Sequence, residues 1–439
     1  MNIILLSGGS GKRLWPLSND IRSKQFVRML TNEAGETESM LTRVYRQITS
    51  IDPDARITVA SGKKQASLIK NQLGDRVNLC VEPCRRDTFP AICLAAAYLH
   101  DVAGVHSDSA VVVCPVDPYV ENSYFKALEE LAQLAEKGDS HLVLMGMEPT
   151  YPSEKYGYII PVSSDRISRV QSFREKPDAE TAREYIEQGA LWNGGVFAFK
   201  LGYLLDKARE RIGYAEYDRL YEQYGELEKI SFDYAVAERE KEIQVLRYQG
   251  EWKDLGTWNT FSEAMAEYTL GQVTLNDTCE NTHVINELNI PVICMGCKDM
   301  VIAASSDGIL ISDKEQSSYI KPYVEKIEQQ VMYAEKSWGS FTVLDVQEDS
   351  LTIKIVLLPG HGLHYHSHEH RDEVWTVMSG SGRAVIDGEE RKVRPGDVLT
   401  MPAGCRHTIL ADSELKVLEV QLGKDIRVED KCKYEMPGA

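Results

Sequence analysis

The sequence predicts an α/β domain with a mainly parallel sheet, then a small β connector, and then an all-β barrel at the C-terminal end. Apolar strand-like runs alternate with amphipathic helical segments from residue 1 to about residue 264, which is typical of a parallel α/β sheet. From 273 to 313, short β-type segments are separated by Asn, Asp and Gly. Beyond Trp338, strand-like runs divided by glycine turns continue to the C-terminus, as in an all-β barrel. The predicted domains are 1–265, 266–330 and 331–439.

The elements are expected in the order that this fold class requires. The opening strand is the apolar run 3–6, which reads as short and buried. The strands and helices that follow it are expected at 56–60 (strand), 91–100 (helix), 110–114 (strand), 124–137 (helix) and 141–146 (strand). The β segments of the connector are expected at 284–285, 292–294, 301–303 and 309–311. A charged, helical linker over 315–330 leads into the barrel.

The composition excludes some classes of partner. The chain of 439 residues has a net charge of -18, so nucleic acid and an anionic membrane surface would both repel it. No apolar run approaches the roughly 18 residues that a bilayer helix needs, and we expect no membrane partner. The nine cysteines lie mostly in apolar runs, which favours a reducing compartment. We expect a cytoplasmic protein that forms a homo-oligomer, a dimer.

A glycine-rich loop follows the opening strand. Gly8, Gly9 and Gly11 allow a tight turn that brings backbone N–H groups against an anionic ligand. Arg13 and Lys24 add positive charge. The loop is not a Walker A loop, because no Gly-Lys-Ser/Thr closes it, and the dinucleotide fingerprint needs a further glycine where Arg13 stands. A phosphate-binding loop is the functional interpretation, and a solvated glycine turn is the structural one.

A family resemblance favours the functional interpretation. Residues 6–18, Leu-Ser-Gly-Gly-Ser-Gly-Lys-Arg-Leu-Trp-Pro-Leu-Ser, with Lys-Gln-Phe at 24–26, resemble the signature of sugar-1-phosphate nucleotidyltransferases, above all their mannose-1-phosphate guanylyltransferase branch. The resemblance implies a Rossmann-like nucleotidyltransferase domain. It also implies that Arg13 and Lys24 are catalytic and that the nucleotide is bound by Leu6, Gly8, Gly9, Gly11 and Lys12. Two departures are Lys12, where the family usually has Thr, and Ser23, where it usually has Pro.

Two aspartates match metal-binding positions of this family. Asp117 follows the strand 110–114, at the carboxyl end where α/β folds place ligands, and Asp254 lies in Trp-Lys-Asp-Leu-Gly-Thr-Trp at 252–258. Taken alone, both would be ordinary turn or capping residues. The resemblance implies that Asp117 and Asp254 are catalytic carboxylates that hold Mg²⁺, which neutralises charge during nucleotidyl transfer. Pro118 replaces the family's usual His.

Further matches follow in the family's order. Residues 82–92 resemble a loop near the nucleotide base, which implies nucleotide contacts for Glu82, Arg86 and Thr88. In that loop Arg85 replaces Gly and Asp87 replaces Asn, and a carboxylate accepts hydrogen bonds but cannot donate them as an amide does. Segments at 156–159, 173–177 and 192–197 resemble the sugar-site loops, and the residues implied to bind the sugar phosphate are Gly157, Tyr158, Glu175, Lys176 and Asn193.

The reaction implied by the resemblance is displacement at the α-phosphorus of GTP by the phosphate of mannose 1-phosphate, giving GDP-mannose and pyrophosphate. Positioning and charge neutralisation would supply most of the catalysis. The alternative left open is a nucleotidyltransferase for another sugar 1-phosphate or another NTP, which the changes at Arg85 and Asp87 permit.

The barrel carries two cupin motifs. Gly360, His366, His368, Glu373 and Gly380 fit the first motif, and the second is fitted by Gly396, Pro402, Gly404 and His407. The two imidazoles of His366 and His368 are expected on one face of a strand, because side chains alternate with period two. With Glu373 and His407 they could complete a three-histidine, one-carboxylate site for a divalent transition metal such as Zn²⁺.

The complete domain order resembles bacterial bifunctional mannose-1-phosphate guanylyltransferase/mannose-6-phosphate isomerases. The chain departs from that family at the first metal position, where His366 replaces Gln. Isomerisation of mannose 6-phosphate and fructose 6-phosphate also needs a base, and no residue can be assigned to that role from spacing. A cupin that only binds metal, senses a ligand or supports assembly is therefore the alternative.

Overall fold

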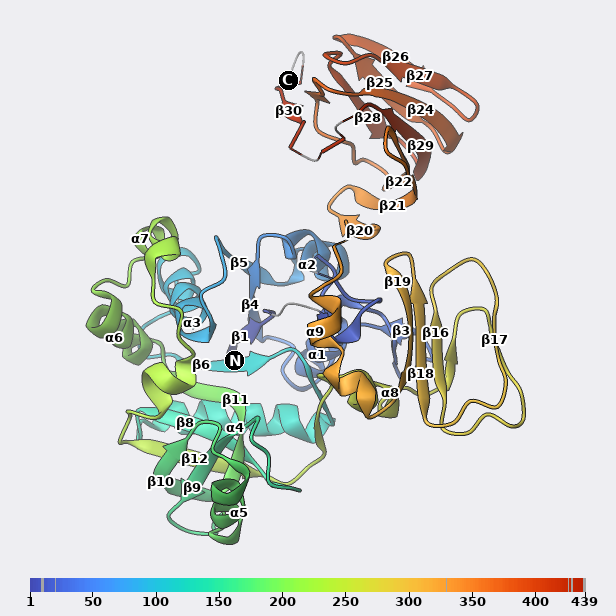
Figure 1. The fold of residues 1–439 in the computed structure, drawn as a ribbon. Coiled ribbons are helices and arrows are strands. Elements are labelled where there is room, and N and C mark those ends of the chain that lie inside the picture. Colours follow the sequence, from blue (N-terminus) through green and yellow to red (C-terminus); the bar gives the residue numbers. More distant parts are fainter. Residues whose placement is uncertain (9–11, 20, 329, 425, 428, 437–439) are drawn as a thin grey trace. The chain divides into compact units, whose positions relative to one another are not determined.

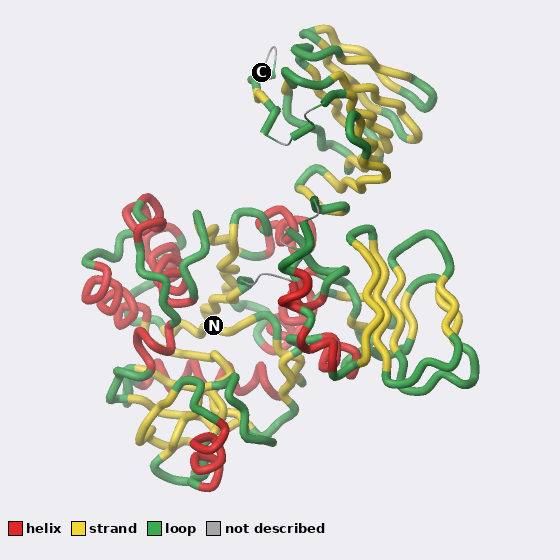
Figure 2. Tube along the Cα trace, viewed as in Figure 1, coloured by secondary structure: helices red, strands yellow, loops and turns green. Residues whose placement is uncertain are grey.

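A computed structural model describes residues 1–8, 12–19, 21–328, 330–424, 426–427 and 429–436 (Figure 1). The chain divides into two compact units. The first comprises Met1–Ser10 and Ser23–Ala266, and the second comprises Gly11–Arg22 and Glu267–Ala439. Figure 2 shows helices and strands mixed in the first unit, whereas strands and loops dominate the second.

A nine-stranded sheet forms the centre of the first unit, in the order β5-β4-β1-β6-β11-β8-β12-β10-β9. Its strands are β1 (Asn2–Leu6), β4 (Arg56–Gly62), β5 (Asn78–Glu82), β6 (Ala110–Pro115), β8 (Leu142–Met147), β9 (Gly157–Pro161), β10 (Ile167–Arg174), β11 (Leu191–Lys200) and β12 (Ile243–Tyr248). Strands β5, β4, β1 and β6 are parallel, as are β8 and β12. The predicted α/β fold class is confirmed, although β11 is antiparallel to both β6 and β8 and makes the sheet mixed.

Helices cover both faces of this sheet. The helices are α1 (Met40–Ile51), α2 (Ala66–Leu73), α3 (Thr88–Ala97), α4 (Asn122–Lys137), α5 (Ala179–Glu187), α6 (Leu201–Ile212), α7 (Tyr217–Glu222) and α8 (Trp258–Glu263), with shorter turns η2 (Lys24–Phe26), η3 (Gly74–Arg76), η4 (Tyr98–Val102), η5 (Tyr224–Glu226) and η6 (Asp233–Ala237). Within β1, Ile3 and Leu5 enter one core with α1 and α4, whereas Ile4 enters the other core with α3 and α6. Because both faces are buried, residues 3–6 of β1 are an uninterrupted apolar run.

Two pairs of short strands lie beside this sheet. They are β2 (Leu30–Thr31) with β3 (Thr37–Glu38), and β7 (Pro118–Val120) with β13 (Trp252–Asp254). The β7–β13 pair is antiparallel and joins segments that are far apart in the sequence. It therefore brings the loop after β6 next to the end of β13.

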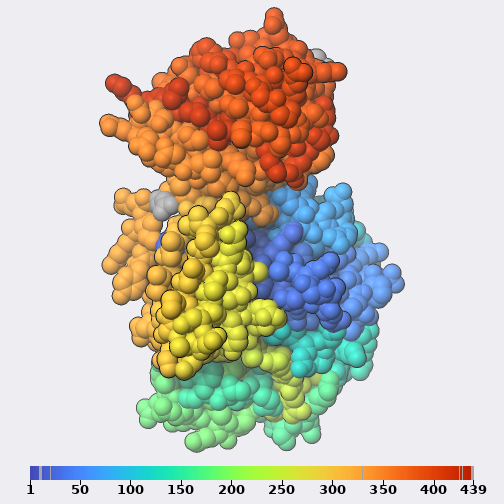
Figure 3. Space-filling model, turned by 90° about the vertical axis from the view of Figure 1, so that its right-hand side faces the viewer, coloured from blue at the N-terminus to red at the C-terminus, as the bar shows by residue number. Residues whose placement is uncertain are grey.

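The connector is a small β structure that also holds residues from the N-terminal region. Its strands are β14 (Thr269–Leu270), β15 (Val273–Leu275), β16 (His283–Asn286), β17 (Val292–Cys294), β18 (Met300–Ser305) and β19 (Gly308–Asp313). They pair in the orders β14-β16-β18-β19 and β15-β17, and Figure 3 shows the atoms of this segment in yellow and light orange. The segment that follows the glycine loop contacts them: the Arg22 guanidinium pairs with Glu287 at 2.8 and 2.9 Å, and the Ser305 hydroxyl donates to the Pro16 carbonyl at 2.7 Å. The sequence did not predict this connection.

The linker contains less helix than the sequence predicts over 315–330. Its described helical parts are a 3-10 turn, η7 (Gln316–Tyr319), and one turn of α-helix, α9 (Lys321–Val324). Pro322 lies at the start of α9. Since proline donates no N–H and favours a helix start over a helix interior, the two turns stay separate.

The barrel consists of two antiparallel sheets. One has the order β20-β21-β22-β29-β24-β27 and the other β26-β25-β28-β23-β30. The strands are β20 (Tyr333–Lys336), β21 (Gly339–Val346), β22 (Ser350–Leu357), β23 (His366–Ser367), β24 (Asp372–Ser379), β25 (Gly382–Ile386), β26 (Glu389–Val393), β27 (Val398–Met401), β28 (His407–Ala411), β29 (Leu415–Leu422) and β30 (Cys432–Lys433). Trp375, Leu415 and Val417 form part of its core. Among the described residues of the whole chain, no helix has the length and apolar character needed to cross a membrane.

Candidate functional site

Three predicted residues meet at the end of the β7–β13 pair. Asp117 precedes β7 and Asp254 ends β13, and the antiparallel register places Pro118 opposite Asp254. Lys24, the first residue of η2, directs its ammonium group between the two carboxylates. Its Nζ atom lies 2.9 Å from Asp117 Oδ2 and 3.6 Å from Asp254 Oδ1. One cation therefore bridges two carboxylates that come from distant parts of the sequence.

These aspartates line a pocket of about 230 Å³. Five predicted site residues line it: Leu6, Thr88, Asp117, Asn193 and Asp254. Of the eight further lining residues, Tyr156, Gly194, Gly195 and Phe197 lie in the predicted sugar-site loops, and the other four were not predicted as site residues: Pro115, Pro118, Asp233 and Trp252. The pocket joins the carboxyl ends of β1 and β6 to β11 and β13, so it lies at an edge where α/β sheets bind ligands.

The predicted nucleotide residues lie around the start of α3. Asp87 caps this helix, because the Thr88 N–H donates to Asp87 Oδ1 at 2.7 Å. The Thr88 hydroxyl in turn accepts from the Phe232 N–H at 2.8 Å. Burial raises the pKa of Glu82, whose carboxylate accepts a hydrogen bond from the Tyr224 hydroxyl at 2.7 Å. Buried Arg86 Nε has no hydrogen-bond partner among the described residues, so this donor is available to a ligand.

The predicted sugar residues Gly157, Glu175 and Asn193 lie close together. A Cβ atom at Gly157 would lie 2.5 Å from Glu175 Oε2, 3.0 Å from the Phe173 ring and 3.4 Å from the Asn193 Cβ atom, so a larger residue would displace the Glu175 carboxylate. The Glu175 side chain is 6% exposed, and its Oε1 atom pairs with Lys176 Nζ at 2.6 Å. Its Oε2 atom has no hydrogen-bond partner among the described residues. A buried acceptor without a partner is suited to a sugar hydroxyl.

Asp233 is a site residue that the sequence analysis missed. Its Oδ1 atom accepts a hydrogen bond from the Asn193 amide at 2.6 Å, while Asn193 Oδ1 accepts from the Gly195 N–H at 3.1 Å. The Asn193 side chain is thereby held at both ends. Burial, and then the negative charge of Glu175, raise the pKa of Asp233 to about 7. No spacing pattern singled out this aspartate, because its relation to Asn193 arises only in the folded chain.

Other predicted residues are placed differently. The Tyr158 side chain is in the core, where its hydroxyl bonds the Ser153 backbone and accepts from Trp192 Nε1. Lys12 and Arg13 lie in the 3-10 turn η1 (Lys12–Leu14), which belongs to the second unit. Gly8 is exposed. Gly9 and Gly11 lie outside the described residues.

A second cluster lies in the barrel, where the four predicted metal ligands converge. His366 is on β23, His368 directly follows that strand, Glu373 is on β24 and His407 is on β28. All four are about 1–2% exposed. One potential ligand atom from each lies within 4.8 Å of the others. The cupin motifs therefore identified a set of side chains that the fold brings together.

The backbone sets the tautomer of each histidine. His366 Nδ1 lies 2.6 Å from the His364 carbonyl oxygen, and His407 Nδ1 lies 3.0 Å from the Cys405 carbonyl oxygen. His368 Nδ1 is hydrogen-bonded to the Asp430 carbonyl oxygen. Because a carbonyl only accepts, each Nδ1 carries the proton and each Nε2 keeps its lone pair for a ligand. Burial lowers the pKa of His366 to about 2, so its imidazole is neutral.

The facing groups of this cluster need positive charge between them. His368 Nε2 is 3.0 Å from Glu373 Oε1, and His407 Nε2 is 3.1 Å from Glu373 Oε2. A lone pair and a carboxylate oxygen at this distance repel each other unless a proton or a cation lies between them. Arg371 supplies part of that charge, with Nε 3.1 Å from Glu373 Oε1 and Nη2 3.1 Å from His368 Nε2. The donor set fits a divalent transition metal.

Buried Glu419 is a further acidic group in the barrel. Burial, and then the negative charge of Glu373, raise the pKa of Glu419 to about 8. Its carboxylate also accepts a hydrogen bond from the Gln421 amide. The sequence analysis did not predict this buried carboxyl group beside the cluster.

The fold of both parts of the chain agrees with comparisons to known families. Residues 2–270 match the model described as nucleotidyl transferase, and residues 354–421 match the model described as cupin domain. The first match spans more than half of the chain, so this chain belongs to the nucleotidyl transferase family, with a cupin domain at its C-terminal end.

Particular relatives narrow the class further. The chain is 28% identical to mannose-1-phosphate guanylyltransferase ManC of Salmonella typhimurium, over 98% of this chain and 97% of that protein. It is also 28% identical to the mannose-1-phosphate guanylyltransferase of Escherichia coli K12, with the same coverage of both chains. Among solved structures, a mannose-1-phosphate geranyltransferase from Thermus thermophilus is similar, with a TM-score of 0.64 and 28% identity over 75% of this chain and 99% of that one.

Proposed function

We propose that this protein transfers a guanylyl group from GTP to mannose 1-phosphate, giving GDP-mannose and pyrophosphate. The observation that carries the proposal is the meeting of Lys24, Asp117 and Asp254 at one end of a pocket. Relatives named mannose-1-phosphate guanylyltransferase match nearly the whole chain, which supports the choice of substrates.

The carboxylate pair fits a divalent cation. In this structure the Lys24 ammonium lies between Asp117 and Asp254, which indicates that the pair attracts positive charge at that point. Oxygen ligands with partial solvent access are those that Mg²⁺ prefers, and bound Mg²⁺ would neutralise charge on the α-phosphate. Asp117 and Asp254 would hold the ion, and Lys24 would turn from them toward a phosphate oxygen. Arg13, Lys12 and the amides of the glycine loop are proposed to bind the triphosphate, and Glu82, Arg86 and Thr88 the nucleoside.

The sugar phosphate is proposed to lie at the opposite end of the pocket. Glu175 Oε2 would accept from a sugar hydroxyl, since it has no other partner among the described residues. Lys176 would bind the sugar phosphate, and the remaining Asn193 N–H would donate to a second hydroxyl. Asp233 fixes the direction of that amide by accepting its other N–H at 2.6 Å. The phosphate of the sugar would then attack the α-phosphorus without a covalent enzyme intermediate, and rate enhancement would come from positioning and charge neutralisation.

The decisive experiment is Mg²⁺-dependent pyrophosphate release by the purified chain. The four NTPs are crossed with mannose, glucose, N-acetylglucosamine and heptose 1-phosphates. Release confined to GTP with mannose 1-phosphate is the expected result. Release with another pair would keep the reaction class and change the substrates, and silence with every pair would contradict the proposal.

Isomerisation of mannose 6-phosphate and fructose 6-phosphate is a second candidate activity, located in the barrel. The His366, His368, Glu373 and His407 donor set favours it, because a bound Zn²⁺ or similar ion would polarise a sugar carbonyl. The test is conversion of mannose 6-phosphate by the full chain with and without added metal. Metal binding without conversion would leave the barrel as a metal-binding or assembly module.

We also propose the domain boundaries, the cellular location and the oligomeric state of the chain. We keep the domain boundaries at 1–265, 266–330 and 331–439, a cytoplasmic location and a homodimer. Sedimentation of the full chain, and of a chain truncated within 315–330, tests the dimer and the part of the barrel in it.

A further inference from the structure

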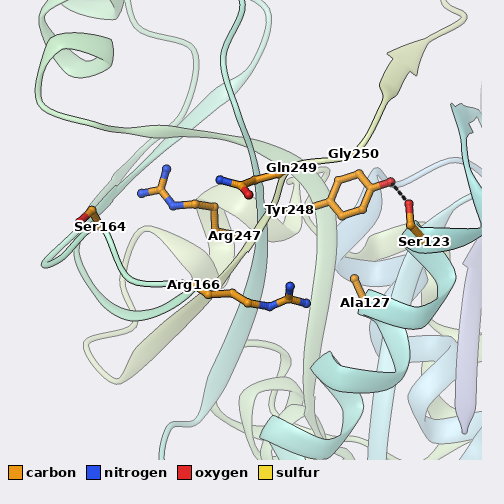
Figure 4. Close-up of a pocket in the computed structure, with 8 residues that line it drawn as sticks. All are labelled: Ser123, Ala127, Ser164, Arg166, Arg247, Tyr248, Gln249 and Gly250. Atoms are coloured by element: carbon orange, nitrogen blue, oxygen red, sulfur yellow. Dashed lines mark hydrogen bonds between the residues drawn. The ribbon is translucent and has the colours of Figure 1, made fainter.

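The first unit contains a second pocket, of about 330 Å³, which shares no lining residue with the pocket described above. It lies between the first turns of α4, the loop after β9 and the end of β12 (Figure 4). Arg166 extends toward Ala127, Arg247 extends toward Ser164 at the other end of the pocket, and the hydroxyl groups of Ser123 and Tyr248 meet beside Ala127. Neither arginine has a part in the proposed transfer reaction.

Arg247 provides a donor that the protein itself does not use. Its Nη1 atom pairs with Glu148 at 2.6 Å, and its side chain is only 13% exposed. Its Nε atom is buried and has no hydrogen-bond partner among the described residues. A buried guanidinium N–H without an acceptor is costly, so this edge of Arg247 is suited to a ligand oxygen.

Arg166 gives the pocket a second, more exposed cation. Its side chain is 65% exposed, and its Nη2 atom pairs with Glu130 at 2.5 Å. Each guanidinium has five N–H donors, and one carboxylate partner does not satisfy all of them. Two arginines that keep unused donors beside one pocket are typical of sites for phosphate groups, which guanidinium binds through two parallel hydrogen bonds.

We propose that this pocket binds the phosphate group of a small phosphorylated molecule. The cavity is larger than a phosphate group requires and falls in the size range of small-molecule sites, so it has room for an organic part. Ser164 and Gln249 add neutral polar groups for that part. The N-terminus of α4, a helix of 16 residues, also directs its partial positive charge toward this side of Ser123.

The position of the pocket connects it to the catalytic aspartates. Ser123 comes three residues after β7, and Tyr248 comes four residues before β13. Their hydroxyl groups are 2.9 Å apart, and Gly250 packs against them, since a Cβ atom there would lie 2.1 Å from the Tyr248 hydroxyl. This contact ties together the two segments that carry Asp117 and Asp254. A phosphate that takes a hydrogen bond from either hydroxyl would compete with this contact, so, if the transfer reaction is the one proposed above, we expect binding here to change its rate.

Binding is tested directly, without turnover, so that failure here is distinct from failure of the proposed reaction. The full chain is titrated calorimetrically with inorganic phosphate, GMP and mannose 6-phosphate. The variants are Arg166→Ala and Arg247→Lys, and the matched control is Arg169→Ala, which removes an exposed arginine that lies on β10, just after this loop, but outside the pocket. We expect the dissociation constant to rise about tenfold in both pocket variants and to stay unchanged in the control.

The outcomes separate the sources of the phosphate. Equal affinity for inorganic phosphate and the two monoesters supports a site for the phosphate group alone, and tighter binding of one monoester identifies the organic part. No binding of any probe, or the same affinity in all variants, overturns the site. Arg166 is exposed, so Arg166→Ala remains informative even where Arg247→Lys unfolds the chain.

An effect of binding at this pocket on Asp117 and Asp254 is measured separately, through the rate of pyrophosphate release. A saturating probe should change kcat for pyrophosphate release in the wild-type chain and in Arg169→Ala, but not in Arg166→Ala. An equal change in all three chains would come from the catalytic pocket and would overturn the coupling.

Discussion

The two clusters of this protein bring charged groups together in opposite ways. In the transferase pocket, the side chains of Lys24, Asp117 and Asp254 are 18%, 39% and 37% exposed, and the positive charge between the carboxylates is a flexible lysine. In the barrel, the ligand side chains are about 2% exposed, and backbone carbonyls hold the imidazoles in place.

This difference in exposure predicts a difference in what each cluster binds. An open carboxylate pair suits an ion that arrives with its substrate and keeps some water, as Mg²⁺ does. A closed set of neutral imidazoles suits a metal that stays in the protein, because the fixed Nε2 atoms need no reorganisation on binding. The comparison predicts that burial of the ligands, more than their number, separates an exchangeable metal site from a resident one. Four experiments test it, from the largest expected effect to the smallest.

The largest effect is expected for Asp254→Ala. Loss of one of the two carboxylates should lower the rate of pyrophosphate release by about 10³-fold, while nucleotide binding changes little, because the carboxylate acts mainly on charge that develops during the reaction. Steady-state assays and nucleotide titration measure the two quantities. Asp139→Ala removes an exposed aspartate as the control. A variant with normal turnover would remove Asp254 from the site.

The next effect concerns the barrel. Glu373→Gln keeps the shape of the side chain but removes its charge, and we expect the metal affinity of the purified chain to fall by about 100-fold or more. Metal content after dialysis against a chelator measures this, with His364→Ala as the matched control, since that histidine is exposed and supplies only its carbonyl. Pyrophosphate release should be normal in both variants. Equal metal content in the two variants would contradict the predicted ligand set.

A smaller effect is expected from the pH dependence of Asp233. Because its pKa is raised from 3.8 to about 7, the folded chain keeps this proton over a range in which the unfolded chain has lost it. The free energy of unfolding should therefore fall as the pH rises from about 4 to 7 and be level above 7. In Asp233→Asn this fall should disappear, which removes about 1–2 kcal/mol of the pH-dependent change in the free energy of unfolding, after allowance for partial exposure of the side chain.

Urea unfolding between pH 5 and 8, followed by hydrogen exchange of β11, measures this change in the first unit. Asp165→Asn alters an exposed aspartate and should leave the profile as it is in the wild-type chain. A profile that keeps its slope in Asp233→Asn would mean that Asp233 titrates as an ordinary aspartate.

The smallest effect is expected for Asp87→Asn, which restores the residue that the family resemblance predicts. Both residues cap a helix, so the stability of α3 should change by less than about 0.5 kcal/mol. The ratio of kcat/KM for GTP and ATP should change only a few-fold, because an amide adds one donor at an exposed position. A change of a hundredfold or more would place Asp87 in direct contact with the base.

Much of the transferase site follows from the sequence. The ordered motifs named Lys24, Asp117, Asn193 and Asp254; Lys24 starts a 3-10 turn, Asp117 follows β6, Asp254 ends β13, and Asn193 lies inside β11. The cupin spacing named the four side chains that the fold brings together in the barrel. A place for Gly157 in the sugar site was also predicted, and the structure places its Cα next to the Glu175 carboxylate, where a larger side chain would displace that group.

Other features required long-range contacts that no local pattern encodes. The pairing of Asp233 with Asn193 joins η6 to β11. Residues 11–22, which include part of the glycine-rich loop motif, belong to the second unit, where Arg22 pairs with Glu287. The antiparallel direction of β11 also depends on which strands it pairs with, because an apolar run buried on both faces reads the same in either direction.

The sequence by itself therefore determined the class of each domain and predicted which side chains gather in each cluster, because both depend on residue type and short spacing. The tertiary structure alone decided which charges face each other and which are buried. It placed Arg247 with an unused donor beside Arg166, and it set the pKa of Asp233, because desolvation and charge contacts arise only when distant segments pack together.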